Sequence, residues 1–472
     1  MTKRPYGGKS ASPVTSRRLE GLDAFRGRIV PGVVNEPRGL SRSFRTVSAS
    51  LWRQRVQIVF FLLLIGIETW FLRVENLPQH QRMVRLYWLG VLPMPVRYAD
   101  FRIVLAGIEG SRAGADVWDS CRPCAAAGGL PGDLPFNYPK TNVWLGRLMP
   151  EGWTPNDAEW IGPLIDVTFL LAAATLLCSS HLGQVAFSAA ILVSPPVLLG
   201  LDRANYDLII FSLVLLNLRV INKWSNGGAY VTAFALGLLK IYPVVMILGL
   251  IKKTKASLLW FLATVAAEIA FIFLALGQIR NVARNSPQTV YPSYGFPLAF
   301  RFLQSYLQSK KVPTALVAAS GSAFLFLTCF CVVVMFLTWR NRERLIALFF
   351  SIRPAERSAF FTGAAVFSLS FAAGLNFNYR LIFLLFTVPH LFAILRDGEA
   401  AAARVGRVIL VILFAVLWLP LFYRGPQGVF YLSEIVLTWV LFGFFTSGCL
   451  AALYPLFNIR GEKDMVTEIA GT

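Results

Sequence analysis

Residues 229–251, AYVTAFALGLLKIYPVVMILGLI, decide the topology of the chain. The stretch is long and apolar enough to cross a membrane, but Lys240 and Pro243 stand near its middle, and proline breaks a helix. The basic residues on its two flanks are Arg219, Lys223, Lys252, Lys253 and Lys255. A single crossing would put these flanks on opposite sides, against the positive-inside tendency. We therefore predict two short helices, 229–239 and 243–251, that enter and return on the same side.

The rest of the chain is just as apolar. Of its 472 residues, 56% are hydrophobic and 15% are charged, which excludes soluble, collagen-like and disordered proteins. Spans of about 20 mostly apolar residues are predicted at 56–72, 162–178, 184–200, 206–221, 257–277, 313–339, 357–375, 380–396, 406–423 and 429–456. The sequence thus predicts an all-α polytopic membrane protein with about 10 or 11 transmembrane helices and one broken or re-entrant segment.

The charge distribution orients these spans. A net charge of +20 would suggest a nucleic-acid partner in a soluble protein, but here it marks cytoplasmic segments, and no nucleic-acid partner is expected. Residues 1–55 are rich in Arg, Ser, Gly and Pro, so we predict a disordered basic cytoplasmic tail that touches membrane lipids. Residues 56–457 form the predicted transmembrane domain, with a large external loop at 73–161 and a second cytoplasmic tail at 458–472.

This topology places four polar segments on the external face. They are Asp100, Leu201–Asp207, Lys240–Pro243 and Asn376–Arg380. Ionisable residues near the hydrocarbon are costly and tend to mark pathways or sites. Each segment alone also fits a snorkelling cation or a helix cap, but the convergence of four favours a site. Lys240 has no acid beside it in the sequence, so we expect it to face a polar cavity or a bound anion.

The external loop carries the remaining signals. Residues 84–108 are apolar but contain prolines and charges, so we expect them to lie along the membrane surface, as suits an enzyme that acts on a lipid-anchored substrate. Cys121 and Cys124 form a C-x-x-C pair, which fits a local disulfide; zinc binding or thiol exchange would require a second ligand pair. No catalytic role is assigned to the pair. The scattered histidines predict no metal, and no cofactor is expected.

Six motifs in this order resemble a known family. They are Tyr98-Ala-Asp100-Phe101, Gly-Ala-Asp116-Val-Trp118-Asp119, Phe136-Asn-Tyr138-Pro139, Asn205-x-Asp207, Leu239-Lys240-Ile-Tyr242-Pro243 and Asn378-Tyr379-Arg380-x-x-Phe383-Leu384. Their order and topology are similar to those of the polyprenyl-phosphate-sugar-dependent glycosyltransferases of family 87, over about residues 56 to 400. Lys140 replaces the second proline usual after Tyr-Pro, and a cysteine-containing insert separates Asp119 from Phe136. These departures bear on which acceptor the enzyme would use more than on the chemistry of sugar transfer.

The resemblance implies a C-type glycosyltransferase fold in the bacterial inner membrane. Such an enzyme transfers mannose or a related hexose or pentose, with inversion, from a polyprenyl-phosphate sugar donor to a glycolipid or glycan acceptor on the extracytoplasmic face. Asp100 would be the general base, and the donor phosphate would bind Lys240, Arg380 and Arg203. Supporting roles would fall to Asp202, Asp207, Asn205, Tyr242, Tyr379 and Tyr138. The aspartates would orient cations or cap a helix, and the tyrosines would stack on sugar faces.

Two other functions stay open. A polysaccharide polymerase or ligase would also place arginines and a long loop outside, but it would use a lipid pyrophosphate donor. A secondary transporter would explain many spans and buried charges, but it predicts internal repeats with paired broken helices. The sequence has one broken segment and no repeat of it at a matching position.

Overall fold

The computed structural model describes residues 38–118, 120–129, 136, 138–146, 148–252, 254–285, 293–309, 320–350, 353–422 and 427–457. The chain divides into two compact units, residues 1–51 and 52–472, and the helical bundle belongs to the second. Three predicted features lie outside the described residues: most of the amino-terminal tail, the tail at 458–472, and Asp119 of the second motif.

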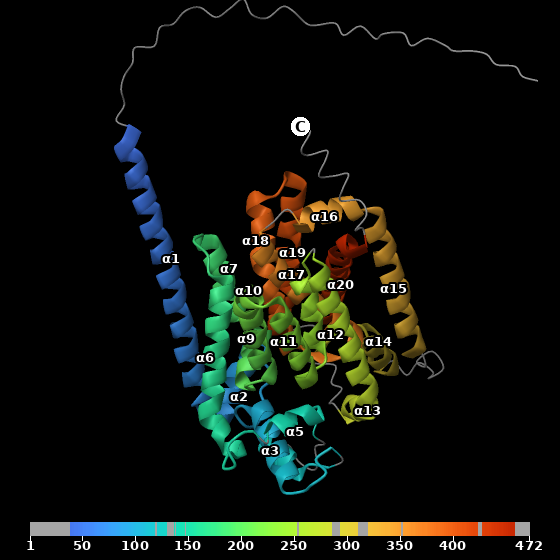
Figure 1. The fold of residues 1–472 in the computed structure, drawn as a ribbon. Coiled ribbons are helices and arrows are strands. Elements are labelled where there is room, and N and C mark those ends of the chain that lie inside the picture. Colours follow the sequence, from blue (N-terminus) through green and yellow to red (C-terminus); the bar gives the residue numbers. More distant parts are fainter. Residues whose placement is uncertain are drawn as a thin grey trace, which may run out of the picture. The chain divides into compact units, whose positions relative to one another are not determined.

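Helices make up nearly all of the described structure (Figure 1). The α-helices are α1 (Arg38–Glu75), α2 (Gln79–Trp88), α3 (Ala99–Arg112), α4 (Arg122–Ala127), α5 (Lys140–Gly146), α6 (Ala158–Leu177), α7 (Leu182–Leu192), α8 (Pro195–Asp202), α9 (Tyr206–Leu216), α10 (Asn222–Trp224), α11 (Asn226–Leu239), α12 (Lys255–Leu274), α13 (Leu276–Asn285), α14 (Leu298–Ser309), α15 (Ser320–Arg340), α16 (Arg342–Phe350), α17 (Pro354–Ala373), α18 (Val388–Asp397), α19 (Ala400–Trp418) and α20 (Gln427–Phe457).

Short non-α elements connect these helices. The 3-10 helices are η1 (Pro155–Asp157), η3 (Tyr242–Leu250), η5 (Asn378–Thr387) and η6 (Leu419–Phe422), and η2 (Asn217–Ile221) is a π-helix. Within the described part of the chain, the strands are β1 (Ser293–Tyr294) and β2 (Asn376–Phe377). They pair antiparallel, with Ser293 opposite Phe377 and Tyr294 opposite Asn376.

Where the structure describes the predicted spans, they coincide with one helix or with two in succession. By length and composition, six described helices can cross a membrane, or up to eight if each bent pair counts as one span. One such pair is α7 and α8, bent by 50°. The predicted count of about 10 or 11 is higher, since the predicted spans 206–221 and 357–375 are not among these candidates. The protein is an all-α polytopic membrane protein.

The boundary of the amino-terminal tail differs from the prediction. Helix α1 begins at Arg38, so the expectation of disorder through residue 55 is wrong for residues 38–55. After Gly39, no glycine or proline interrupts the chain until Gly66, and Arg, Leu, Ala and Ser all tolerate the helix. The helix that contains the apolar span 56–72 thus begins within the polar residues that precede the span.

The stretch 229–251 is broken where predicted. Helix α11 ends at Leu239, η3 begins at Tyr242, and Lys240 lies in extended backbone between them. The outer ends of the two arms meet, because the Lys252 amino group donates to the Asn222 carbonyl at 3.4 Å. The stretch is therefore a helical hairpin with Lys240 at its tip. Its second arm is a 3-10 helix, whereas the sequence predicted an ordinary short helix.

Helix α17 is the central support of the fold and packs against η3, η5 and α20. Two glycines permit this close approach. A Cβ on Gly249 of η3 would lie 2.4 Å from the Ser358 carbonyl oxygen, and one on Gly363 of α17 would lie 2.7 Å from the Phe383 carbonyl oxygen. Both 3-10 helices therefore touch α17 backbone to backbone, which brings their first residues to the same end of the bundle.

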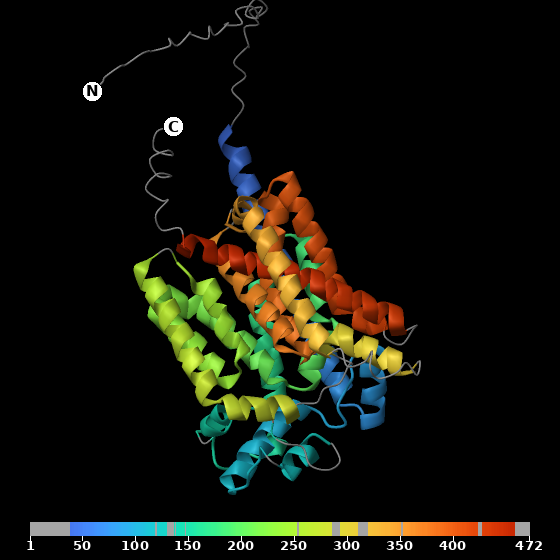
Figure 2. The same cartoon turned by 90° about the vertical axis from the view of Figure 1, so that its right-hand side faces the viewer.

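The short helices of the predicted external loop gather at that end. Figures 1 and 2 show α3 and α5 beyond the ends of α9 and α11, at the bottom of both views. Helix α3 contacts α4, α5 and η1, and α5 contacts α11. Residues 84–108 contain parts of α2 and α3 with an irregular stretch between them, rather than one spanning helix. We call this end of the bundle the loop end.

Candidate functional site

The connection between α8 and α9 supplies the first part of the site. Ala204 adopts a φ of 42°, which turns the chain sharply after α8. Asn205 caps α9, since its side-chain oxygen accepts the Asp207 backbone N–H at 2.9 Å. Asp207 is therefore held in the first turn of α9, where its side chain is fully buried.

Two cations converge on Asp207 from distant parts of the chain. The Lys240 amino group, at the tip of the hairpin, donates to Asp207 Oδ1. Arg380, at the start of η5, places its Nε 3.4 Å from Asp207 Oδ2. Lys240 was expected to face a polar cavity or a bound anion, and in the structure it pairs with a buried carboxylate. Its partner lies 33 residues earlier in the sequence, and a buried ammonium requires such a partner.

Asp100 joins the same network through Asn205. The Asn205 amide donates to Asp100 Oδ2, while its oxygen holds the Asp207 N–H. Arg203 Nη1 lies 3.8 Å from Asp100 Oδ1. Two backbone bonds fix the start of α3 on this junction: Tyr98 N–H donates to the Asp202 carbonyl at 2.9 Å, and Phe101 N–H to the Arg203 carbonyl at 3.4 Å. One asparagine thus connects both carboxylates of the site.

We call Asp100, Arg203, Asp207, Lys240 and Arg380 the charge cluster. It contains three cations and two carboxylates, so with every group ionised its formal charge is +1. The Asp207 side chain is 0% exposed, whereas those of Asp100 and Arg380 are 13% and 24% exposed. Asp100 and Arg380 are therefore the members most accessible to a ligand, and the excess positive charge favours an anion.

Aromatic rings surround the cations of the charge cluster. The Lys240 amino group lies 5.4 Å from the Tyr138 ring centre, and the Arg380 guanidinium lies 5.0 Å from that of Tyr242. Tyr379 stacks on Phe377 at 5.6 Å. The predicted tyrosines are thus all at the site, but Tyr138 and Tyr242 offer their faces to cations. Burial raises the pKa of Tyr138 well above its usual range, so this phenol stays neutral.

The loop end also supports the hairpin tip. A helix leaves its last carbonyl groups unpaired, and those of α11 precede Lys240 directly. The Asn142 side-chain amide donates to the Leu239 carbonyl at 3.0 Å, and the Thr141 hydroxyl donates to the Leu238 carbonyl. Helix α5 therefore caps α11 from outside. This contact holds the extended backbone at Lys240 in place.

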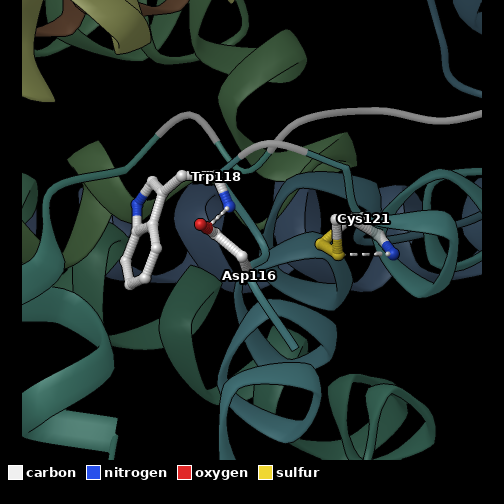
Figure 3. The surroundings of a disulfide bond; sticks show 4 residues. Asp116, Trp118 and Cys121 are labelled. Carbon is white, nitrogen blue, oxygen red and sulfur yellow. Dashed lines mark hydrogen bonds between the residues drawn. A yellow bond between two sulfur atoms is a disulfide. The ribbon is translucent and has the colours of Figure 1, made fainter. Parts of the chain in front are cut away.

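The cysteine pair and Tyr138 belong to the same buried hydrophobic cluster in the loop region. Cys121 and Cys124 form a disulfide, and the Cys121 sulfur also accepts the Cys124 backbone N–H at 3.2 Å. Figure 3 shows this bond near Asp116, whose carboxylate accepts the Trp118 N–H. The Trp118 indole in turn donates to the Tyr138 carbonyl at 3.0 Å. The disulfide therefore belongs to the loop segment that positions Tyr138, and the open choice between disulfide and zinc is resolved.

Asp202 does not act with the charge cluster. Its Oδ1 pairs with Arg82 Nη1 at 2.6 Å, and Arg82 also pairs with Glu75 at 3.1 Å. The three side chains, at most 2% exposed, form what we call the anchor triad. A second Arg82 nitrogen donates to the Met94 carbonyl. Asp202 was expected to orient the phosphate-binding cations or cap a helix, and in the structure its carboxylate pairs with Arg82 of α2. Sequence reasoning missed both Glu75 and Arg82.

Comparison with known proteins adds no identification. The chain matches no protein-family model, no curated protein and no solved structure. Within the described ranges, no group of three or more His, Cys, Asp or Glu side chains could hold a metal ion. A functional assignment must therefore rest on the charge cluster and on the order of the motifs that supply it.

Proposed function

We propose that the protein is a membrane glycosyltransferase that uses a polyprenyl-phosphate sugar and has the C-type fold. One observation carries the proposal. A partly exposed carboxylate, Asp100, is linked to Arg380, a partly exposed cation, through the hydrogen bonds of Asn205 and the ion pair between Asp207 and Arg380. Sugar transfer from a lipid phosphate requires these two groups together: a base for the acceptor hydroxyl and a cation for the departing phosphate.

In this proposal Asp100 starts the reaction. Its carboxylate takes the proton of the acceptor hydroxyl while the hydroxyl oxygen attacks the anomeric carbon. A new carbon–oxygen bond forms on one face of the sugar, and the bond to the phosphate oxygen breaks on the other, so the configuration inverts. The bonding electrons leave with the polyprenyl phosphate. The hydrogen bond from Asn205 and the nearby Arg203 orient the Asp100 carboxylate for this step.

Arg380 is the proposed main contact of the donor phosphate. Asp207 engages its Nε, which leaves the two terminal nitrogens for the paired contact with phosphate that arginine favours. Lys240 is 9% exposed and bonded to Asp207, so its proposed role changes from direct phosphate contact to positioning. It offsets the Asp207 charge, which would otherwise repel the phosphate, and leaves the cluster with a formal excess of +1.

The charge balance favours this donor over the alternatives. A polyprenyl-phosphate sugar is a phosphodiester with one negative charge, which the excess charge of the cluster matches. A lipid pyrophosphate, the donor of a polysaccharide polymerase or ligase, has two. A secondary transporter would use the hairpin as one of two related broken helices. Extracytoplasmic transfer to a glycolipid or glycan in the inner membrane follows from the proposed topology and from the family resemblance.

The test is sugar transfer by the purified protein in detergent. The mixture contains a radiolabelled polyprenyl-phosphate mannose and membrane glycolipid extract, and labelled lipid products are separated by chromatography. Parallel reactions replace the donor with nucleotide-linked or pyrophosphate-linked sugar. The proposal requires labelled product with the phosphate donor alone. Transfer only from pyrophosphate donors would assign a polymerase or ligase, and mannose uptake into proteoliposomes without transfer would assign a transporter.

A further inference from the structure

A cavity of about 600 Å³ lies at the end of the bundle opposite the charge cluster. Its lining includes Arg219, Lys223, Leu248 and Arg357. Three elements run from one site to the other. Helix α9 with η2 begins beside Asp207 and ends at the cavity, η3 begins beside Lys240 and ends there, and α17 begins there and leads to β2 and Arg380. Residues 206–221 alone rise about 24 Å.

Four cations surround this cavity: Arg219, Lys223, Lys252 and Arg357. They come from η2, α10, the segment after η3, and α17, and the lining that the structure describes contains no aspartate or glutamate. Among the residues with described positions, no carboxylate forms an ion pair with any of the four. This differs from the charge cluster, where carboxylates offset two of three cations. Four cations around one hollow form a site of strong positive potential.

The Arg357 side chain is held in place by contacts with Phe350. Its guanidinium lies 4.8 Å from the Phe350 ring centre, and its Nη1 donates to the Phe350 carbonyl at 3.5 Å. The side chain is thus held against the cavity wall. Pro354 begins α17 at the same place, where Glu356 in the first turn offsets the partial positive charge of the unpaired N–H groups. The fixed guanidinium of Arg357 is therefore the feature here that favours a bound anion.

The walls of the cavity are apolar. Leu218, Leu248 and Phe361 line it, beside the buried Leu250 and Ala359. The cavity also lies where several apolar helices end, which is the level of lipid headgroups in a membrane protein. Positive-inside charges require only a count of basic residues on one side. They do not require that four segments place those residues around one hollow with apolar walls.

We propose that this cavity binds the phosphate group of an anionic membrane lipid. The lysines and arginines contact the phosphate oxygens, and the apolar walls contact the glycerol and the first methylene groups of the acyl chains. The shared chemistry is a phosphate ester, which a soluble phosphate could also supply, so the test must separate these two sources. The site lies apart from the charge cluster, and the proposal stands or fails independently of glycosyl transfer.

The test measures lipid binding to the full chain in a neutral detergent by native mass spectrometry and thermal unfolding. The probes are phosphatidylglycerol, phosphatidylcholine and inorganic phosphate. The expected result is a bound phosphatidylglycerol and a raised melting temperature, with no such effect of phosphatidylcholine. Equal stabilisation by phosphatidylcholine would overturn the proposal. Equal stabilisation by inorganic phosphate at the same concentration would overturn the lipid assignment.

Two matched double variants locate the site. Lys252→Gln with Arg357→Gln should weaken phosphatidylglycerol binding about tenfold or more, because each basic residue near the lipid surface contributes about 1 kcal/mol. Arg340→Gln with Arg344→Gln removes the same charge at exposed positions outside the cavity lining and should leave binding unchanged. An equal loss in both variants would make the attraction nonspecific. If the first variant fails to fold, the exposed Lys223→Gln should still weaken binding measurably, and unchanged binding there would contradict the proposal.

Discussion

Asp202 and Asp207 stand five positions apart at one helix junction, and both are fully buried. Asp202 ends α8 and pairs with Arg82 in the anchor triad, whose three side chains are at most 2% exposed. Asp207 begins α9 and pairs with Lys240 and Arg380, and Arg380 remains 24% exposed. The difference is not in the aspartates but in their partners. Only the charge cluster has a cation that can also reach a ligand.

This comparison separates a structural ion group from a functional one. Removing one partner of a closed, buried group leaves charge without compensation and costs stability. Removing an accessible member of an open group costs ligand binding or catalysis instead. Substitutions in the anchor triad should therefore mainly lower the stability of the fold, and substitutions in the charge cluster should mainly lower turnover. Single substitutions in each group test that division.

The largest effect is expected at Asp100. Asp100→Asn keeps the shape and the contact with Asn205 but removes the proton acceptor, so turnover should fall by about 10²- to 10⁴-fold. The melting temperature should stay near that of the wild type. Sugar transfer and thermal unfolding are measured on the same preparation, and Glu109→Gln, at an exposed position of the same helix α3, serves as a control that retains activity. Near-normal turnover of the Asp100 variant would remove it from the base role.

Arg82→Met should mainly affect stability. The change leaves Glu75 and Asp202 buried without their cation, so the free energy of unfolding should fall by about 3–5 kcal/mol. Protein that remains folded should keep its affinity for the donor. Thermal unfolding in detergent measures the first quantity, and donor binding at low temperature measures the second. A large loss of affinity with unchanged stability would place Arg82 among the functional residues. It would contradict the distinction between a structural anchor triad and a functional charge cluster.

Arg380→Gln should show the opposite pattern. Asp207 keeps Lys240 as its partner, so the fold should survive, but the donor loses a charge-assisted contact worth about 1.5–3 kcal/mol. The ratio kcat/KM should then fall by roughly 10- to 150-fold. Arg380→Lys should recover only part of this loss, since lysine cannot make the two-pronged contact. Full recovery by lysine would show that charge alone matters there.

Asn205→Ala should have a modest effect on stability and a mixed effect on function. Loss of the α9 cap costs about 0.5–2 kcal/mol. The variant also removes the link between Asp100 and Asp207, so turnover should fall while KM for the donor changes little. Kinetics and thermal unfolding together test both parts. A change confined to stability would reduce Asn205 to a helix cap.

Much of the fold could be predicted from the sequence, because apolar run length and proline positions act locally. The apolar runs predicted where the long helices lie, and Pro243 predicted the break in the hairpin. The charge asymmetry then placed the flanks of the hairpin at one end, where Lys252 does contact Asn222. The same reasoning brought Asp100, Asp207 and Arg380 together.

The pairing of charges could not be predicted in the same way. Arg82 lies 120 residues before Asp202, and nothing local marks Arg82 as buried. Its helix, QHQRMVRLYW, has polar and basic residues typical of an exposed surface. Which acid meets which base depends on how α2 packs against the junction, and this is a tertiary property. For that reason the sequence did not show that Lys240 pairs with Asp207 or that Asp202 pairs with Arg82.

The 3-10 arm of the hairpin fixes its length. A 3-10 helix rises about 2.0 Å per residue, so the nine residues of η3 cover about 18 Å, close to the roughly 21 Å of the 14-residue α11. The stretched arm lets a short segment return over nearly the full height of its longer partner. Loss of one residue from η3 would draw Lys240 about 2 Å away from Asp207, which is enough to separate the pair.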